Sequence, residues 1–262
     1  MAQIFAIVNQ KGGVGKTTTT LNLGAYLANA GKRVLIVDLD PQGNASSGIG
    51  INHREVEHGL YEALVGHSTV DQALHETNHD GLHIIPTNQN LAGASVELVG
   101  HENREFVLHK ILAPLKEKYD FILVDCPPSL GLLTLNGLVA SDQVVIPIQA
   151  EYYALEGLGQ LLNTIELVRD NLKPELNVFG AVITMYDQRT KLSKDVLTEL
   201  YKHFPNKIFR SVIPRSVRLA EAPSFGQTIL GYDPKSKAAR AYERLTTEFL
   251  LRDEEHRETE TL

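Results

Sequence analysis

The feature that most constrains the fold is a glycine-rich segment with two lysines, Lys-Gly-Gly-Val-Gly-Lys-Thr-Thr, at residues 11–18. An apolar run typical of a strand precedes it at residues 4–8, and a pattern typical of a helix follows it at residues 19–30. In this context the backbone N–H groups of the loop and of the helix N-terminus point to one spot and attract anions. The sequence therefore predicts a phosphate-binding loop made of Lys11, Gly12, Gly13, Val14, Gly15, Lys16, Thr17 and Thr18.

The two ends of this loop are expected to have different tasks. Lys16 is predicted to reach the β- and γ-phosphates of a nucleotide, and the Thr17 hydroxyl to hold Mg²⁺, which prefers oxygen ligands. The usual pattern, G-x-x-x-x-G-K-[ST], has a glycine where this chain has Gln10. Lys11 is an addition to that pattern. A second lysine so close to the first is expected only where a second negative group needs neutralising.

Short apolar runs alternate with helical patterns along the rest of the chain. Helical patterns are clearest at residues 155–171 and 192–204. The apolar runs are nearly continuous, which is typical of strands buried on both faces in a parallel sheet. The sequence thus predicts an α/β fold, a doubly wound, mostly parallel sheet with helices on both faces. The strand candidates are residues 4–8, 33–38, 82–85, 120–125, 143–148 and 178–183, with 208–213 as a weaker seventh.

No linker divides the 262 residues, so residues 1–251 are predicted to form one domain of the P-loop NTPase type. Residues 44–80 are expected to form short surface helices, and the acidic residues 252–262 a disordered tail. The single cysteine fits a reducing cytoplasm. The N-terminus lacks a secretory pattern, and no apolar run approaches the ~20 residues that a membrane span needs. We therefore expect a cytoplasmic protein.

Three aspartates follow or end apolar runs. Asp125 ends one run and precedes Cys-Pro-Pro-Ser, the Walker B arrangement in which a strand-ending aspartate supports Mg²⁺. Asp38 and Asp40 lie at the end of another run. Such groups gather at the carboxyl ends of parallel strands, where open α/β sheets place their ligands. Thr17, Asp38 and Asp125 are therefore the predicted metal site, although an aspartate at a strand end also serves as a turn cap.

The loop resembles the deviant phosphate loop of the ParA/MinD family of ATPases. The resemblance continues over most of the chain and is closest to the chromosomal ParA (Soj) group, which are DNA-segregation ATPases. The matching segments are residues 11–18, 38–43, 125–129, 151–156 and 213–222.

This resemblance implies a role for several residues of the chain. It implies that ATP and Mg²⁺ are bound, and that Lys11 reaches the nucleotide of a partner in a homodimer that sandwiches two ATP molecules. It implies that Asp40 positions the attacking water. It also implies that Met185 and Pro214 contact adenine, although apolar packing explains both residues equally well.

Charge is distributed unevenly along the chain. The whole chain has a net charge of −7, but residues 185–244 carry 12 Lys/Arg and 6 Asp/Glu, a net +6. Such asymmetry indicates a local footprint for a polyanion. The resemblance implies that Arg189 and Arg218 contact the DNA backbone. An ordinary solvated surface is the alternative. The residues predicted to bind double-stranded DNA through its phosphates, without sequence preference, are Arg189, Arg215, Arg218, Lys235, Lys237 and Arg240.

These expectations combine into one cycle. ATP closes the homodimer, which aligns two basic faces and binds DNA, and hydrolysis removes the γ-phosphate and releases DNA. Intrinsic hydrolysis is expected to be slow. The resemblance implies stimulation by a ParB-type centromere-binding protein, and association with the nucleoid.

Three alternatives belong to related ATPases. A membrane-associated positioning ATPase like MinD ends in a basic amphipathic helix, whereas this chain ends in acidic residues. An electron-transfer ATPase like the nitrogenase iron protein needs two cysteines per chain, and this chain has only Cys126. A ParA relative that positions another cargo would have the same chemistry, and the sequence alone separates it poorly.

Overall fold

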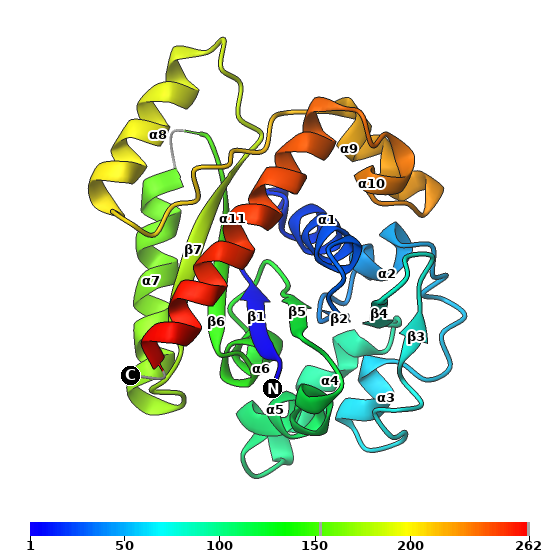
Figure 1. Ribbon diagram of the computed structural model, residues 1–262. Coiled ribbons are helices and arrows are strands. Elements are labelled where there is room, and N and C mark those ends of the chain that lie inside the picture. Colours follow the sequence, from blue (N-terminus) through cyan, green and yellow to red (C-terminus); the bar gives the residue numbers. More distant parts are fainter. Residues whose placement is uncertain (152–153, 261–262) are drawn as a thin grey trace.

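The computed structural model describes residues 1–151 and 154–260, and its centre is a seven-stranded sheet in the order β3-β4-β2-β5-β1-β6-β7 (Figure 1). Neighbouring strands pair in parallel, except that β3 is antiparallel to β4. The carboxyl ends of the central strands therefore meet at one edge of the sheet, and the predicted doubly wound fold is confirmed. The strands are β1 Gln3–Ile7, β2 Val34–Asp38, β3 His75–Glu76, β4 Leu82–Ile85, β5 Phe121–Asp125, β6 Gln143–Gln149 and β7 Asn177–Thr184.

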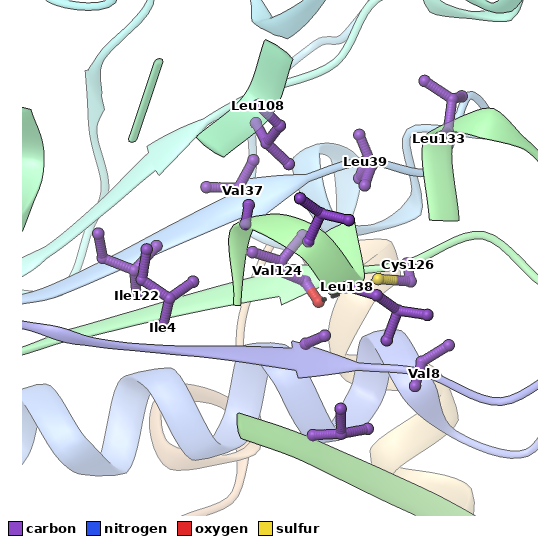
Figure 2. Close-up of a cluster of buried hydrophobic side chains, with 14 of the residues drawn as sticks. Ile4, Val8, Val37, Leu39, Leu108, Ile122, Val124, Cys126, Leu133 and Leu138 are labelled. Carbon is purple, nitrogen blue, oxygen red and sulfur yellow. Dashed lines mark hydrogen bonds between the residues drawn. The ribbon is translucent and has the colours of Figure 1, made fainter. Parts of the chain in front are cut away.

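Helices cover both faces of the sheet, because successive residues of each strand point to opposite sides. In β1, Phe5 and Ile7 face a core shared with α1 and α11, whereas Ile4 faces a core shared with α5, α6 and α7. Figure 2 shows part of this second core, where Val124 of β5 lies beside Leu138 of α6. The helices are α1 Lys16–Asn29, α2 Asn44–Gly48, α3 Leu60–Leu64, α4 Leu91–Glu97, α5 Val107–Leu112, α6 Leu132–Ala140, α7 Ala154–Asn171, α8 Lys191–His203, α9 Val217–Glu221, α10 Ile229–Tyr232 and α11 Lys237–Glu260.

Two strand predictions differ from the structure. Residues 208–213 run beside β7 and share backbone hydrogen bonds with it, such as Phe209 N to Ala181 O at 2.9 Å, but only an isolated bridge forms there. The seventh strand is instead β3, a two-residue edge strand that the sequence did not indicate. A pair of residues with mixed polarity carries no periodicity, so pattern analysis could not find it.

Helix α11 continues to Glu260, so the prediction of a disordered tail from residue 252 was wrong. Arg252 donates from Nη1 to Phe179 O at 3.0 Å, and its guanidinium lies 4.2 Å from the centroid of the Phe209 ring. Asp253 is buried and accepts a hydrogen bond from Arg257 Nε at 2.9 Å, one helical turn away. These contacts hold the acidic segment against the domain. The net charge of the segment, on which the prediction of disorder was based, gives no indication of such contacts.

An aromatic cluster fixes α11 against the sheet. The Phe249 ring of α11 lies 4.8 Å from the rings of both Phe5 and Phe179, measured between centroids. Phe121 and Phe209 complete the cluster at 5.7 and 6.4 Å from Phe249. Because all five side chains are buried, α11 is positioned by the core of the domain.

Candidate functional site

The glycine-rich loop lies between β1 and α1, and its backbone has the form that glycine allows. Gly13 and Gly15 have φ angles of +73° and +89°, a left-handed conformation that residues with a Cβ rarely adopt. Thr184 at the end of β7 donates from Oγ1 to Val14 O at 2.7 Å and so braces the loop. The N-cap residue of α1 is Gly15, which has no side chain to cap the helix, so the first N–H groups of α1 are suited to bind an anion.

Lys16 lies inside this loop and is nearly fully buried. Its Nζ donates to Lys11 O at 3.2 Å, so the ammonium is held by the backbone of the loop. Burial lowers the pKa of Lys16, while the nearby Asp125 and Asp40 act in the opposite direction. A buried ammonium with one hydrogen bond to a neutral carbonyl is suited to exchange that bond for a stronger one to a phosphate.

Asp125, at the end of β5, accepts hydrogen bonds from two hydroxyl groups of α1. Thr17 Oγ1 donates to Asp125 Oδ2 at 2.7 Å, and Thr20 Oγ1 donates to Asp125 Oδ1 at 3.0 Å. Burial raises the pKa of Asp125 to about 6. The sequence analysis missed Thr20, although its spacing of three residues from Thr17 places both on one face of the helix.

The donors around Asp125 fit a magnesium ion. Thr17 and Asp125 present oxygen atoms side by side, which is the ligand type that Mg²⁺ prefers. Within the residues that the structure describes, no group of three His, Cys, Asp or Glu side chains could hold a metal. Mg²⁺ commonly takes its remaining ligands from water and substrate phosphates, so a pair of protein oxygens at the loop is sufficient.

The structure places Asp38, which ends β2, and Asp40, which follows it, in different surroundings. Asp38 is fully buried, and its Oδ2 accepts hydrogen bonds from Ser46 N at 2.8 Å and Ser46 Oγ at 2.6 Å. Burial, together with the neighbouring Asp125, raises the pKa of Asp38 to about 7. Asp40 lies in the wall of the cavity beside the loop, where its Oδ1 accepts from Gln42 N at 3.0 Å. Asp38 therefore holds the segment that carries Asp40, and its role as a metal ligand stays a prediction.

The cavity beside the loop has a volume of about 560 Å³ and opens next to a smaller one of about 210 Å³. Of the predicted loop residues, Lys11 and Val14 lie outside the lining and the others line one or both cavities. Met185 lines both, and Pro214 lines the smaller. Met185 has a φ of +51°, a strained conformation for a residue with a side chain, and such strain often marks a functional position.

Lys11 is held by an acidic partner of its own chain. Its Nζ lies 2.7 Å from Glu151 Oε2, and both side chains are about half exposed. Gln149 donates its side-chain N–H to the other oxygen of Glu151. Glu151 begins the segment 151–156 that carries part of the family resemblance, but Tyr152 and Tyr153 lie outside the described residues.

A second hollow of about 740 Å³, here called the basic groove, gathers most of the predicted DNA-binding side chains. Arg189, Arg215, Lys237 and Arg240 line it, and Pro214 and Arg215 also line the smaller cavity near the loop. The sequence analysis missed Arg244, which follows Arg240 by one turn of α11. The complete lining is Tyr186, Asp187, Gln188, Arg189, Val212, Pro214, Arg215, Val217, Lys237, Arg240 and Arg244.

Two predicted DNA-binding residues lie outside this lining. Arg218 of α9 donates from Nη1 to Glu221 at 3.1 Å, and its Nε lies 3.7 Å from Asp233. These acidic partners balance its charge. Lys235 does not line the groove either, although its backbone carbonyl accepts a hydrogen bond from Arg240 Nη2 at 3.2 Å.

Comparison with known proteins agrees with this geometry. A family model described as an AAA domain matches residues 2–178. The chain is 54% identical over 248 residues to the sporulation initiation inhibitor protein Soj of Bacillus subtilis, covering 95% of this chain and 98% of that protein. It is 52% identical to the chromosome-partitioning ATPase Soj of Thermus thermophilus, covering 96% of each.

A solved structure is also similar over nearly the whole chain. It is cobyrinic acid a,c-diamide synthase from Mycobacterium smegmatis with bound ADP and magnesium, at 39% identity and a TM-score of 0.83, covering 94% of this chain and 93% of that one. In the described part of this chain, none of the helices combines the length and hydropathy that crossing a bilayer requires.

Proposed function

The chain belongs to the ParA and Soj family of chromosome-partitioning ATPases, and we propose that it binds DNA as an ATP-closed homodimer and releases it after hydrolysis. One observation carries this proposal. The cavity system beside the phosphate loop and the basic groove meet at Pro214 and Arg215, which line both. A nucleotide and a polyanion would therefore bind to neighbouring parts of one surface.

Residues of the loop and its surroundings are proposed to have separate roles in binding and hydrolysing ATP. Lys16 is proposed to bind the β- and γ-phosphates, and Met185 and Pro214 to border the adenine. Thr17 and Asp125 would hold Mg²⁺, which neutralises charge on the phosphates when bound. Asp40 is proposed to orient the attacking water from the cavity wall. The bound ADP and magnesium of the similar Mycobacterium smegmatis protein support this assignment.

Lys11 is proposed to act on the nucleotide of the partner subunit. In one chain its ammonium is paired with Glu151 at 2.7 Å, so closing the dimer requires this pair to open. An exposed pair of this kind contributes about 0.2–1 kcal/mol. Breaking this ion pair therefore costs little free energy, and the attraction of Lys11 to a phosphate of the second nucleotide can offset that cost.

Replacing Glu151 with glutamine is expected to lower the ATP concentration needed for dimerisation about two- to fivefold, because Lys11 loses its competing partner. Analytical ultracentrifugation across an ATP titration measures this directly. Glu117→Gln removes a charge from an exposed glutamate elsewhere and serves as the control. An increase in the required ATP would instead show that Glu151 helps to close the dimer.

DNA binding by the wild-type protein tests the proposed function itself. We expect double-stranded DNA of arbitrary sequence to bind with ATP but weakly with ADP or without nucleotide, alongside a doubling of the molecular mass. Each phosphate contact contributes about −0.9 to the slope of log affinity against log salt, so a dimer should show about twice the slope of one chain. Arg189→Ala should weaken binding and reduce that slope by about 0.9 per groove.

Two results would contradict this proposal in different ways. An ATP-bound dimer that does not bind DNA would contradict the role of the basic groove. Binding to vesicles of anionic lipid would then test a MinD-like membrane role. DNA binding that is independent of both nucleotide and dimerisation would contradict the proposed control of DNA binding by ATP. A strong sequence preference would contradict recognition through phosphates.

A ParB-type protein is proposed as the partner that stimulates hydrolysis, and the nucleoid as the place of action. The charge of the chain outside residues 185–244 is strongly negative, which suits a partner that binds through a basic segment. A ParA relative that positions another cargo would share every site described above. Stimulation of the ATPase by a ParB-type protein distinguishes the two.

The name of the similar Mycobacterium smegmatis protein suggests amide synthesis as a second activity, and the chemistry of this chain does not support it. Release of ammonia from glutamine through a thiolate needs a reactive cysteine. Cys126 is the single cysteine of the sequence, it is fully buried among the apolar side chains shown in Figure 2, and burial raises its pKa. It packs as a small apolar residue.

A further inference from the structure

The lining of the basic groove contains one carboxylate, and it is bound to an exposed arginine of the same lining. Asp187 Oδ1 accepts a hydrogen bond from Arg189 Nε at 2.9 Å, and Oδ2 accepts from Arg189 Nη2 at 2.7 Å. The Arg189 side chain is 85% exposed, and that of Asp187 is 23% exposed. This bidentate geometry is the one in which a guanidinium also binds a phosphate.

The turn after β7 fixes this carboxylate in place. Asp187 Oδ1 also accepts from the Arg189 backbone N–H at 3.0 Å. Thr190 donates from both its backbone N–H and its Oγ1 to Asp187 O, at 3.1 and 3.0 Å, and then caps α8. Asp187 is thus held beside Arg189 by its own turn, and these hydrogen bonds with Arg189 keep its pKa low, at about 2.

The remaining charges in the groove are all positive. Arg215 faces Asp187 from the neighbouring loop, and Lys237, Arg240 and Arg244 follow one face of α11. A DNA phosphate entering the groove meets these cations, but the Nε edge of Arg189 is already occupied by a fixed anion. The phosphate must either displace Asp187 or bind beside a like charge.

We propose that the Asp187 carboxylate competes with DNA phosphate for Arg189. This competition lowers the affinity of a single groove for DNA, so firm DNA binding requires the two grooves of a dimer. This inference rests on the proposed function. It assigns to Asp187 a regulatory task that is distinct from the shaping of the turn.

Asp187→Asn tests this task, because the amide oxygen can still accept the Arg189 backbone N–H while the negative charge is removed. The control is Asp195→Asn, which removes an exposed carboxylate of α8 outside the groove lining. Binding of double-stranded DNA is measured without nucleotide and with ATP over a range of salt, together with dimer mass and ATP hydrolysis in the absence of DNA.

Asp187→Asn is expected to bind DNA about three- to tenfold more tightly without nucleotide, with a salt slope steeper by about 0.9 per groove. Asp195→Asn should change affinity less than twofold and should leave dimer mass and DNA-free hydrolysis unchanged. In an Arg189→Ala background the gain from Asp187→Asn should largely vanish, because the competition acts through that arginine.

Unchanged or weakened binding by Asp187→Asn would overturn the inference, since Asp187 would then serve only to orient Arg189. An equal gain in the Arg189→Ala background would also overturn it, because the effect would be a general change of charge. If the wild-type ATP dimer binds DNA while either of these results holds, the proposed function stands and only this inference fails. If the wild-type dimer binds no DNA, both fail.

Discussion

Replacing Lys16 with alanine is expected to weaken ATP binding about 30-fold or more, and to abolish ATP-induced dimerisation and DNA binding with it. The ammonium is nearly fully buried and is held by the loop carbonyl of Lys11 at 3.2 Å. Losing a charged partner from a desolvated site costs about 2–5 kcal/mol, and each 1.4 kcal/mol is tenfold in affinity. Titration calorimetry with ATP and magnesium measures the change.

The same substitution should leave the folded state intact. Burial lowers the pKa of Lys16, which shows that the charged form is disfavoured by its surroundings in the absence of a phosphate. The free energy of unfolding without nucleotide should therefore be unchanged or higher in Lys16→Ala. Lys110→Ala, an exposed lysine of α5, is the matched control for both measurements. ATP affinity within a few-fold of wild type would contradict the role of Lys16.

Asp40→Ala is expected to slow ATP hydrolysis about 100-fold or more while the ATP-bound dimer still forms and binds DNA. Asp40 lies in the cavity wall, and the Gln42 backbone N–H holds one of its oxygens at 3.0 Å. The second oxygen accepts no hydrogen bond from the described residues and is suited to orient a water molecule. Positioned acid–base groups of this kind contribute about 10²–10⁴-fold to a rate.

Phosphate release under single-turnover conditions, with dimer mass measured on the same sample, separates the two effects. Asp40→Asn keeps the size and the contact with Gln42 but loses the charge, and we expect it to be nearly as slow as Asp40→Ala. Hydrolysis at the normal rate would show that another group positions the water. Loss of the ATP-bound dimer would show that Asp40 serves binding instead.

Much of the fold could be predicted from local patterns. The apolar runs that became β1, β2, β5, β6 and β7 are continuous because their strands are buried on both faces, and the glycine loop has a backbone that few other sequences allow. Helices α7 and α8 begin and end within one residue of their predicted bounds. By contrast, the two residues of β3 carry no pattern, and the extent of α11 depends on contacts with β7.

The candidate site was less predictable where it depends on distant residues. The partner of Lys11 is Glu151, which lies 140 residues away in the sequence. Asp38 and Asp40 are two residues apart, a spacing that would place them on one face of a strand. β2 ends at Asp38, however, so that rule does not apply to Asp40, and the two carboxylates lie in different surroundings.

The anchoring of α11 has a mechanical consequence for the basic groove. One wall of the groove carries Lys237, Arg240 and Arg244 on a helix whose position is set by the buried ring of Phe249. The facing wall carries Arg189 and Arg215 on two segments that follow Met185 and Pro214, beside the nucleotide cavities. The groove therefore has one wall positioned by the core of the domain and one that begins at residues of the cavities beside the phosphate loop, so a displacement of those residues would act on the groove through the second wall.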